Sequence, residues 1–197
     1  MSFAVASPSI VRSVVQRNML NSWLRLFDRN RTLPAFPEYR FDRMETEVPD
    51  LAAFIVSWRD GAPRFKMSRQ GSRMAEAFGY APDGTDVEDF VGADLAPQIM
   101  PRYYECLTRY RPVYSSYLVT DTRGREVTLE RLLLPFGEGF RVDTMLGSSK
   151  AISDDGAFEM KDLMRRGGST VLRQAVIDTG FALNGIAKQM DDDVIEI

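Results

Sequence analysis

The chain has 197 residues, of which 44% are hydrophobic and 27% charged, a composition that excludes a disordered polymer and fits one globular domain with extensions. Its net charge of −3 lacks the basic excess that binding to nucleic-acid phosphates requires, so we expect no nucleic-acid partner. No apolar run approaches the roughly 20 residues needed to cross a bilayer, so we expect no membrane span.

The first predicted element is an amphipathic helix over residues 9–29. The prolines of TLPAFPEY, residues 32–39, then require an extended connection, because proline disfavours helical geometry in the residue before it. Residues 1–32 are therefore expected to form a separate N-terminal amphipathic helix. Its apolar residues recur at steps of three and four, which indicates one broad apolar face: Ile10, Val11, Val14, Val15, Met19, Trp23, Leu26 and Phe27.

Two strands and a short helix are predicted between residues 50 and 80. Two apolar runs flank RDGAP, and the Asp60-Gly61 pair within it is a strong hairpin signal. The segment SRMAEAFGY that follows is rich in helix formers, and Gly79 provides a natural helix end. An acidic loop is expected from residue 81 to residue 94.

A longer helix is predicted over residues 95–110, and three antiparallel strands follow it. The sequence periodicity falls to two in VYSSYLVTD, EVTLERLLLPF and FRVDTMLGSS, which are separated by glycine-containing turns. The main domain is therefore expected to span residues 33–150.

Residues 151–197 are expected to form a helical C-terminal extension. Gly167 and Gly168 are expected to separate two helices, with Ser169 or Thr170 as an N-cap. Acidic residues outnumber basic ones in this segment, which makes it the expected place for partner contacts. The apolar side of the last helix is predicted to carry Val171, Leu172, Ala175, Val176 and Phe181.

Five short motifs follow one another along the predicted main domain: TLP at residues 32–34, RFKM at 64–67, AFG at 77–79, YRPVY at 110–114 and ERLLLPF at 130–136. In this order they resemble the motifs of bacterial single-domain PAS proteins. The resemblance implies an α+β fold with a PAS-like five-stranded antiparallel sheet, helices on one face that enclose a small cavity, and flanking N- and C-terminal helices. It also implies a sensory role in signal transduction.

In such a fold the cavity lies between the two helices at 69–78 and 95–110 and the last three strands. The lining would be apolar with a few polar groups, as small-molecule pockets are. The same side chains can instead pack against each other as a filled core, which is the more common arrangement of alternating strand residues. Glu130 and Arg131 are neighbours on a strand and so point to opposite faces, and Arg131 could anchor an anionic ligand or be held by a carboxylate. The candidate pocket residues are Met67, Met74, Phe78, Tyr103, Tyr117, Glu130, Arg131, Leu132 and Met145.

The motif ERLLLPF is apolar on both faces of its strand, whereas an exposed antiparallel sheet alternates between apolar and polar residues. Something must therefore cover the second face. The helix at 9–29 is the expected cover, from the same chain or from a second copy. The PAS resemblance implies that this helix builds a homodimer.

The chain contains no histidine, which excludes histidine-dependent nucleophilic catalysis, zinc sites with histidine ligands and histidine-ligated haem. No metal site and no phosphate-binding loop motif is predicted. Cys106 stands in YECLT rather than in the Asn-Cys-Arg setting of the light-sensing flavin branch of PAS proteins, so cysteinyl-flavin photochemistry is disfavoured and no cofactor is identified. A single cysteine and the lack of a leader pattern fit a cytoplasmic location.

The sequence thus predicts a stand-alone PAS-type sensory or regulatory domain, not an enzyme. It would act through an unidentified signalling protein partner, with a small ligand as modulator. Two alternatives stay open. One is a small cavity enzyme of the isomerase or dehydratase type, with Glu130 or Asp143 as a carboxylate base. The other is a ligand-free dimeric adaptor with a filled core.

Overall fold

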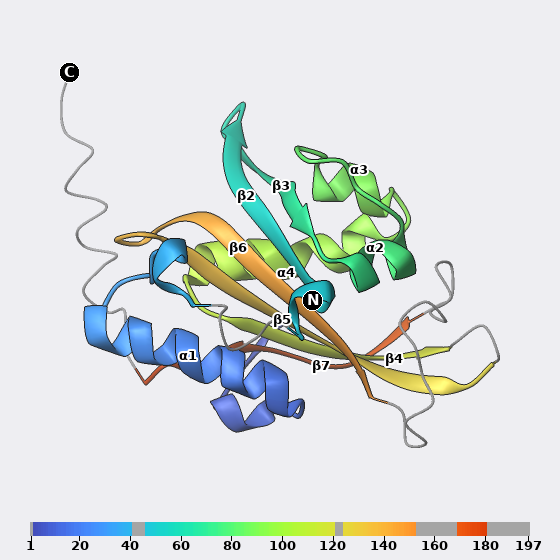
Figure 1. Ribbon diagram of the computed structural model, residues 1–197, viewed down its shortest axis with the longest axis horizontal. Helices are drawn as coiled ribbons and strands as arrows, with labels where there is room; N and C mark the ends of the chain where they lie inside the picture. The colour runs from blue at the N-terminus through green and yellow to red at the C-terminus, as the bar shows by residue number, and fades with distance from the viewer. Residues whose placement is uncertain (1, 41–45, 121–123, 153–168, 181–197) are drawn as a thin grey trace.

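The computed structural model describes residues 2–40, 46–120, 124–152 and 169–180, which form a seven-stranded sheet with helices on both faces (Figure 1). The α+β class expected from the sequence is confirmed. The sheet has two strands more than the expected five, and its order is β1-β7-β4-β5-β6-β2-β3. The strands are β1 (Ala4–Ala6), β2 (Leu51–Arg59), β3 (Ala62–Gln70), β4 (Val113–Thr120), β5 (Glu126–Glu138), β6 (Arg141–Ile152) and β7 (Ser169–Ile177).

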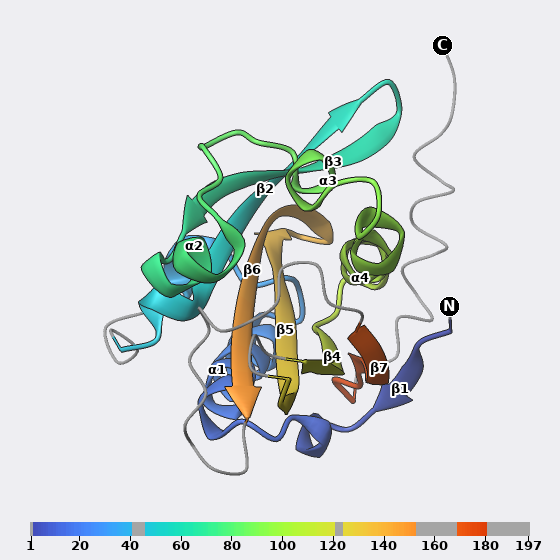
Figure 2. The same ribbon diagram turned by 90° about the vertical axis from the view of Figure 1, so that its right-hand side faces the viewer.

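Four α-helices accompany the sheet in the described part of the chain. The helix α1 (Val14–Asn30) lies on one face of β5 and β6, while α2 (Ser72–Phe78), α3 (Val87–Val91) and α4 (Ala96–Arg109) belong to the other side (Figures 1 and 2). Short 3-10 turns are formed by Pro8–Ile10, Phe36–Glu38 and Val48–Asp50. No helix in the described ranges is long and apolar enough to cross a membrane.

Local chemistry explains the elements that the sequence predicts well. The β2–β3 turn has positive φ at both Asp60 and Gly61, 52° and 74°, which is the backbone geometry of a tight hairpin turn. The helix α2 ends at Gly79, whose N–H donates to the carbonyl of Ala75. In the predicted acidic loop at residues 81–94, the short helix α3 is an addition that the sequence did not indicate.

The segment predicted as a C-terminal helix is a strand where the structure describes it. Residues 169–177 form β7, which pairs antiparallel with β4 and parallel with β1. Ser169 is therefore the first strand residue and not an N-cap. The spacing of Val171 and Ala175 suits a helix as well as a strand, and the free edge of β4 decides in favour of the strand by supplying hydrogen-bond partners. The rest of the predicted helices, including Phe181, lies outside the described residues.

The helix α1 covers the second sheet face from within the same chain. It begins five residues later than predicted, at Val14, where the hydroxyl of Ser13 accepts a hydrogen bond of 3.4 Å from the Gln16 N–H. The indole of Trp23 donates to the carbonyl of Pro135 on β5 at 2.6 Å. The apolar side of α1 is buried against the sheet through Met19, Leu20, Trp23 and Phe27.

Candidate functional site

Different helices cover the two faces of the sheet, and we name the faces by these helices. The front face is the one that packs against α4, and the ring of Tyr103 on α4 lies 5.2 Å from the rings of both Phe54 and Phe65 there. The back face is the one that packs against α1. Side chains alternate between faces along each strand, so Arg131 belongs to the front face and Glu130 to the back face.

Five of the nine predicted pocket residues lie in the front-face layer. Met67 and Met145 are buried in register with Phe54, whose ring contacts Tyr103 of α4. On α2, Met74 is buried and Phe78 is half-buried, but neither belongs to the apolar cluster that contains Met67 and Met145. The remaining two members of the front-face group are Tyr117 and Arg131.

Glu130 and Leu132 do not belong to that group, which corrects the predicted lining. The carboxylate of Glu130 contacts the start of α1, and Leu132 follows it by two positions on the regular part of β5. Residues two apart on a strand share a face. Leu132 is therefore a back-face core residue.

The sequence did not single out Arg102, although the structure buries it at the front face with only 2% of its surface exposed. Its guanidinium carbon lies 4.5 Å from the centre of the Tyr117 ring. One guanidinium nitrogen donates to the carbonyl of Gln98, one turn earlier on α4. The other two, Nε and Nη2, are buried without a hydrogen-bond partner. The available signal was its spacing, because position 102 lies three residues after Ile99 and four before Cys106.

Arg131 lies nearby on β5 and is half-buried. Its Nη2 atom donates to the hydroxyl of Tyr103 at 2.5 Å, and its guanidinium carbon lies 5.4 Å from the centre of that ring. The Nε atom is buried and has no hydrogen-bond partner. The strand partners opposite Arg131 are Ser115 on β4 and Ser149 on β6, which are both buried. Arg131 and these two serines thus form a polar region within an otherwise apolar layer.

Neither arginine forms an ion pair with a carboxylate among the residues that the structure describes. Burial lowers the pKa of Arg102, and the like charge of Arg131 lowers it further, while Tyr117 and Tyr103 act in the opposite direction. Burial also raises the pKa of both phenols, Tyr103 and Tyr117. The two tyrosines are therefore neutral hydroxyls at pH 7 and do not neutralise the arginines.

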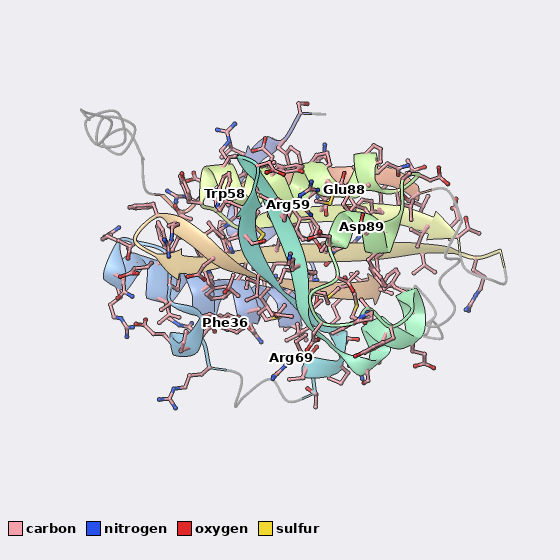
Figure 3. All side chains as sticks on the ribbon, turned by 90° about the horizontal axis from the view of Figure 1, so that it is seen from above. Phe36, Trp58, Arg59, Arg69, Glu88 and Asp89 are labelled. Carbon is pink, nitrogen blue, oxygen red and sulfur yellow. The ribbon has the colours of Figure 1, made fainter. Side chains whose placement is uncertain are left out.

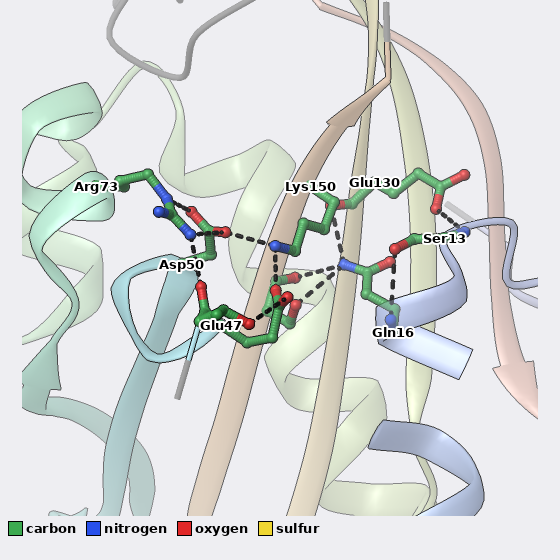
Figure 4. Close-up of polar contacts among 9 residues, drawn as sticks. Ser13, Gln16, Glu47, Asp50, Arg73, Glu130 and Lys150 are labelled. Carbon is green, nitrogen blue, oxygen red and sulfur yellow. Dashed lines mark hydrogen bonds and ion pairs between the residues drawn. The ribbon is translucent and has the colours of Figure 1, made fainter. Parts of the chain in front are cut away.

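The back face carries a second polar cluster, which joins β5 and β6 to the start of α1 (Figure 4). The fully buried side chain of Glu130 accepts a hydrogen bond of 2.9 Å from the Ser13 N–H, and the guanidinium of Arg12 lies 4.0 Å away. The amide of Gln16 donates to the carbonyls of Glu130 and Ser148 at 3.3 and 3.1 Å. A carboxylate is favourable at this position, because the N-terminus of a helix carries a partial positive charge.

A third cluster ties α2 to the sheet, as Figure 4 shows. Arg73 binds the Asp50 carboxylate with two nitrogens, at 2.7 and 2.8 Å, and Lys150 on β6 contacts the same carboxylate at 2.5 Å. Lys150 also pairs with Glu47. Burial raises the pKa of Asp50, but the hydrogen bonds from Arg73 and Lys150 outweigh it and hold that pKa below its usual range. The cluster therefore holds α2 to the sheet and has a structural role.

Two hollows on the described surface lie away from the predicted pocket residues. One, of about 930 Å³, runs along α1 and includes Arg25 and Glu38. The other, of about 760 Å³, lies beside α3 and α4 and includes Glu88. Figure 3 shows Glu88 and Asp89 on α3 and the Trp58 side chain at the end of the β2–β3 hairpin.

Cys106 lies on α4 and is fully buried. Burial raises the pKa of its thiol far above the usual range. The thiol is therefore protonated at pH 7 and is a weak nucleophile there.

No known family profile matches the chain, and no curated protein matches it in sequence. Solved structures do match. The light-oxygen-voltage protein of Rhodobacter sphaeroides is 16% identical with a TM-score of 0.39, and the match covers 60% of this chain and 72% of that one. A single-substitution variant of RsLOV gives the same identity and TM-score over 59% of this chain and 70% of that one. An RNA-binding light-oxygen-voltage receptor is 18% identical with a TM-score of 0.36, over 55% of this chain and 31% of that one.

These neighbours overturn one expectation from the sequence. The setting of Cys106 predicts that cysteinyl-flavin photochemistry is disfavoured, yet the matching structures are those of light-oxygen-voltage proteins, and this prediction is therefore wrong. The strand order β3-β2-β6-β5-β4, with α2, α3 and α4 between β3 and β4, gives this chain the PAS-type fold that the sequence resemblance implies.

Proposed function

We propose that this chain is a PAS-type sensory and regulatory domain in which β5 relays the state of the front face to α1. The observation that carries the proposal is the placement of two consecutive residues. Arg131 contacts Tyr103 of α4 on the front face, and Glu130 contacts Ser13 at the start of α1 on the back face. A shift of the β5 backbone at Arg131 would also move Glu130, because the two residues are consecutive.

The helix α1 is suited to be the responding element. Its start depends on the buried Glu130 and Gln16 contacts, and its apolar side is held by the sheet. If α1 left the sheet, it would expose Met19, Leu20 and Trp23 together. An apolar helix face of this kind binds a partner groove or a second copy of itself, so the output is a protein–protein interaction, including homodimerisation.

The contacts of the acidic side chains favour this role over an enzyme with a carboxylate base. Glu130, one of the two strand candidates, directs an oxygen to the Ser13 N–H and lies on the face away from α4. Asp143, the other, is half-buried, and the buried Cys106 thiol is protonated at neutral pH. A general base needs a cavity-facing position within reach of its substrate.

The relay is tested with tryptophan fluorescence in a Trp58→Phe background. The chain has two tryptophans, and Trp58 is 61% exposed at the hairpin, so this change leaves Trp23 as the only reporter of α1 docking. Arg131→Gln is expected to shift the Trp23 emission to the red and to speed hydrogen exchange in residues 14–30. Glu130→Ala serves as the positive control, because it removes the α1 contact directly.

Arg141→Gln is the matched control, since Arg141 is exposed near the start of β6. It is expected to leave both measurements unchanged. The relay is contradicted if Arg131→Gln leaves Trp23 emission and α1 exchange unchanged while Glu130→Ala alters them.

A further inference from the structure

We propose that Arg102 and Arg131 form a binding site for a small molecule with a carboxylate or phosphate head group, between α4 and the front face of the sheet. This inference rests on the proposed sensory function and names the ligand class for it.

Among the residues that the structure describes, no carboxylate compensates the charge at this place. Arg102 is 2% exposed and lies over the ring of Tyr117. The Tyr117 hydroxyl contacts Ser115, which is the strand partner of Arg131. No acidic group among the described residues pairs with either arginine. Buried charges in folded proteins are normally paired, because removing an unpaired ion from water is unfavourable. An anion would supply the missing charge.

The free hydrogen-bond donors have the right chemistry for an oxyanion. Nε and Nη2 of Arg102 and Nε of Arg131 are buried without partners. Each guanidinium lies over a tyrosine ring, Tyr117 for Arg102 and Tyr103 for Arg131. Stacking of this kind restrains the plane of the guanidinium and leaves the N–H groups at its edge available. Guanidinium N–H groups bind carboxylate and phosphate oxygens in that plane.

The surroundings indicate a ligand with an apolar or aromatic body. Buried hydroxyl groups lie close to the arginines on the sheet side, where the Ser115 and Tyr117 oxygens are 2.8 Å apart. Further along the same face the layer is apolar and includes Phe54, Met67 and Met145. A small molecule that combines an anionic head with an apolar body would match both parts. A metal cation would meet two positive charges and is disfavoured here.

Calorimetry with defined probes tests the site. Benzoate, phenyl phosphate and inorganic phosphate are titrated into the full chain at constant ionic strength, with benzamide as the neutral counterpart of benzoate. We expect saturable one-site binding of benzoate or phenyl phosphate and none of benzamide. Comparison of the two anions distinguishes a carboxylate site from a phosphate site, and inorganic phosphate shows whether the head group suffices.

Two variants and one control assign the binding to this site. Arg102→Gln and Arg131→Gln are each expected to weaken binding by about tenfold or more, because a charge-assisted hydrogen bond to the anion is lost. Arg109→Gln, at an exposed position of the same helix, is expected to leave the affinity unchanged. Binding that persists in both variants, or no binding of any anionic probe at millimolar concentration, overturns the proposal.

Thermal unfolding separates a ligand site from a purely structural role. If the two arginines form an anion-binding site, Arg102→Met raises Tm of the free protein and abolishes the rise in Tm that the anion produces. If Arg102 is a structural group, the same change lowers Tm, which contradicts the proposal. Anion binding without any change in Trp23 emission would keep this site and reject the relay through β5. If Arg131→Gln shifts the Trp23 emission but no anionic probe binds the wild-type protein, the relay is kept and this binding site is rejected.

Discussion

Glu130 and Arg131 are consecutive on β5, yet each contacts a different helix on a different face of the sheet. The Glu130 carboxylate accepts from the Ser13 N–H at the start of α1, and the Arg131 guanidinium donates to the Tyr103 hydroxyl on α4. One peptide bond therefore connects the two helical layers. A backbone shift at this place of β5 would move both contacts together, because consecutive side chains of a strand share the backbone and point to opposite faces.

We expect Glu130→Gln to lower the free energy of unfolding by about 1–2 kcal/mol, because a buried carboxylate that accepts from a helix N-terminus is replaced by a weaker neutral acceptor. Urea unfolding followed by circular dichroism measures this. Glu126→Gln, at an exposed position of the same strand, should be neutral. Equal stability of the Glu130→Gln variant and the wild type would show that Glu130 does not hold α1.

We expect Arg102→Met to raise the stability of the free protein by about 1 kcal/mol, or Tm by roughly 2–4 °C, because an unpaired buried charge is replaced by an apolar side chain of similar length. Differential scanning calorimetry in a buffer without oxyanions measures this. Arg109→Met, at an exposed site of α4, is the control and should change Tm little. A large fall in Tm would show that the contact with Tyr117 outweighs the cost of the charge.

Much of the central sheet is encoded locally, which is why the sequence predicts it. Asp60 and Gly61 both adopt positive φ, which few other dipeptides do readily, and so they form the tight hairpin turn. Gly79 ends α2 through a local hydrogen bond to Ala75. The strand β7 is different, because its conformation depends on the open edge of β4, about 55 residues earlier in the chain. The sequence of residues 169–177 alone does not contain that information.

The candidate site was predictable only in part, for a related reason. Arg131 and Tyr103 follow from the strand pattern and the helical stripe. Arg102 resembles the exposed charge of any amphipathic helix, and its burial and its unpaired nitrogens exist only once α4 meets Tyr117 on β4. Strand alternation divides the residues of β5 into two sets but does not say which set faces α4, so the sequence alone does not exclude Leu132 from the pocket.

The pH dependence of stability should include a contribution from Asp50. Its pKa is lowered in the folded protein by Arg73 and Lys150, so the stabilisation is fully present above the usual pKa of a free aspartate, roughly 3.9. It is lost as the pH falls from there through the lowered folded pKa. Unfolding free energies measured from pH 6 down to pH 3 should therefore fall less steeply for Asp50→Asn than for the wild type. Asp60→Asn, at the exposed hairpin turn, should keep the wild-type slope.

Release of α1 should increase self-association. In Glu130→Ala the start of α1 loses its buried acceptor, and the apolar side that packs on the sheet becomes available to a second chain. Sedimentation velocity over a range of concentrations should show more dimer for Glu130→Ala than for the wild type at each concentration. The double variant Glu130→Ala, Leu20→Ser should reverse the increase, because Leu20 is part of the buried side of α1. If the single variant shows a red-shifted Trp23 emission yet no added dimer, the released helix is not a surface for a second copy. The output of the domain would then require a different protein partner.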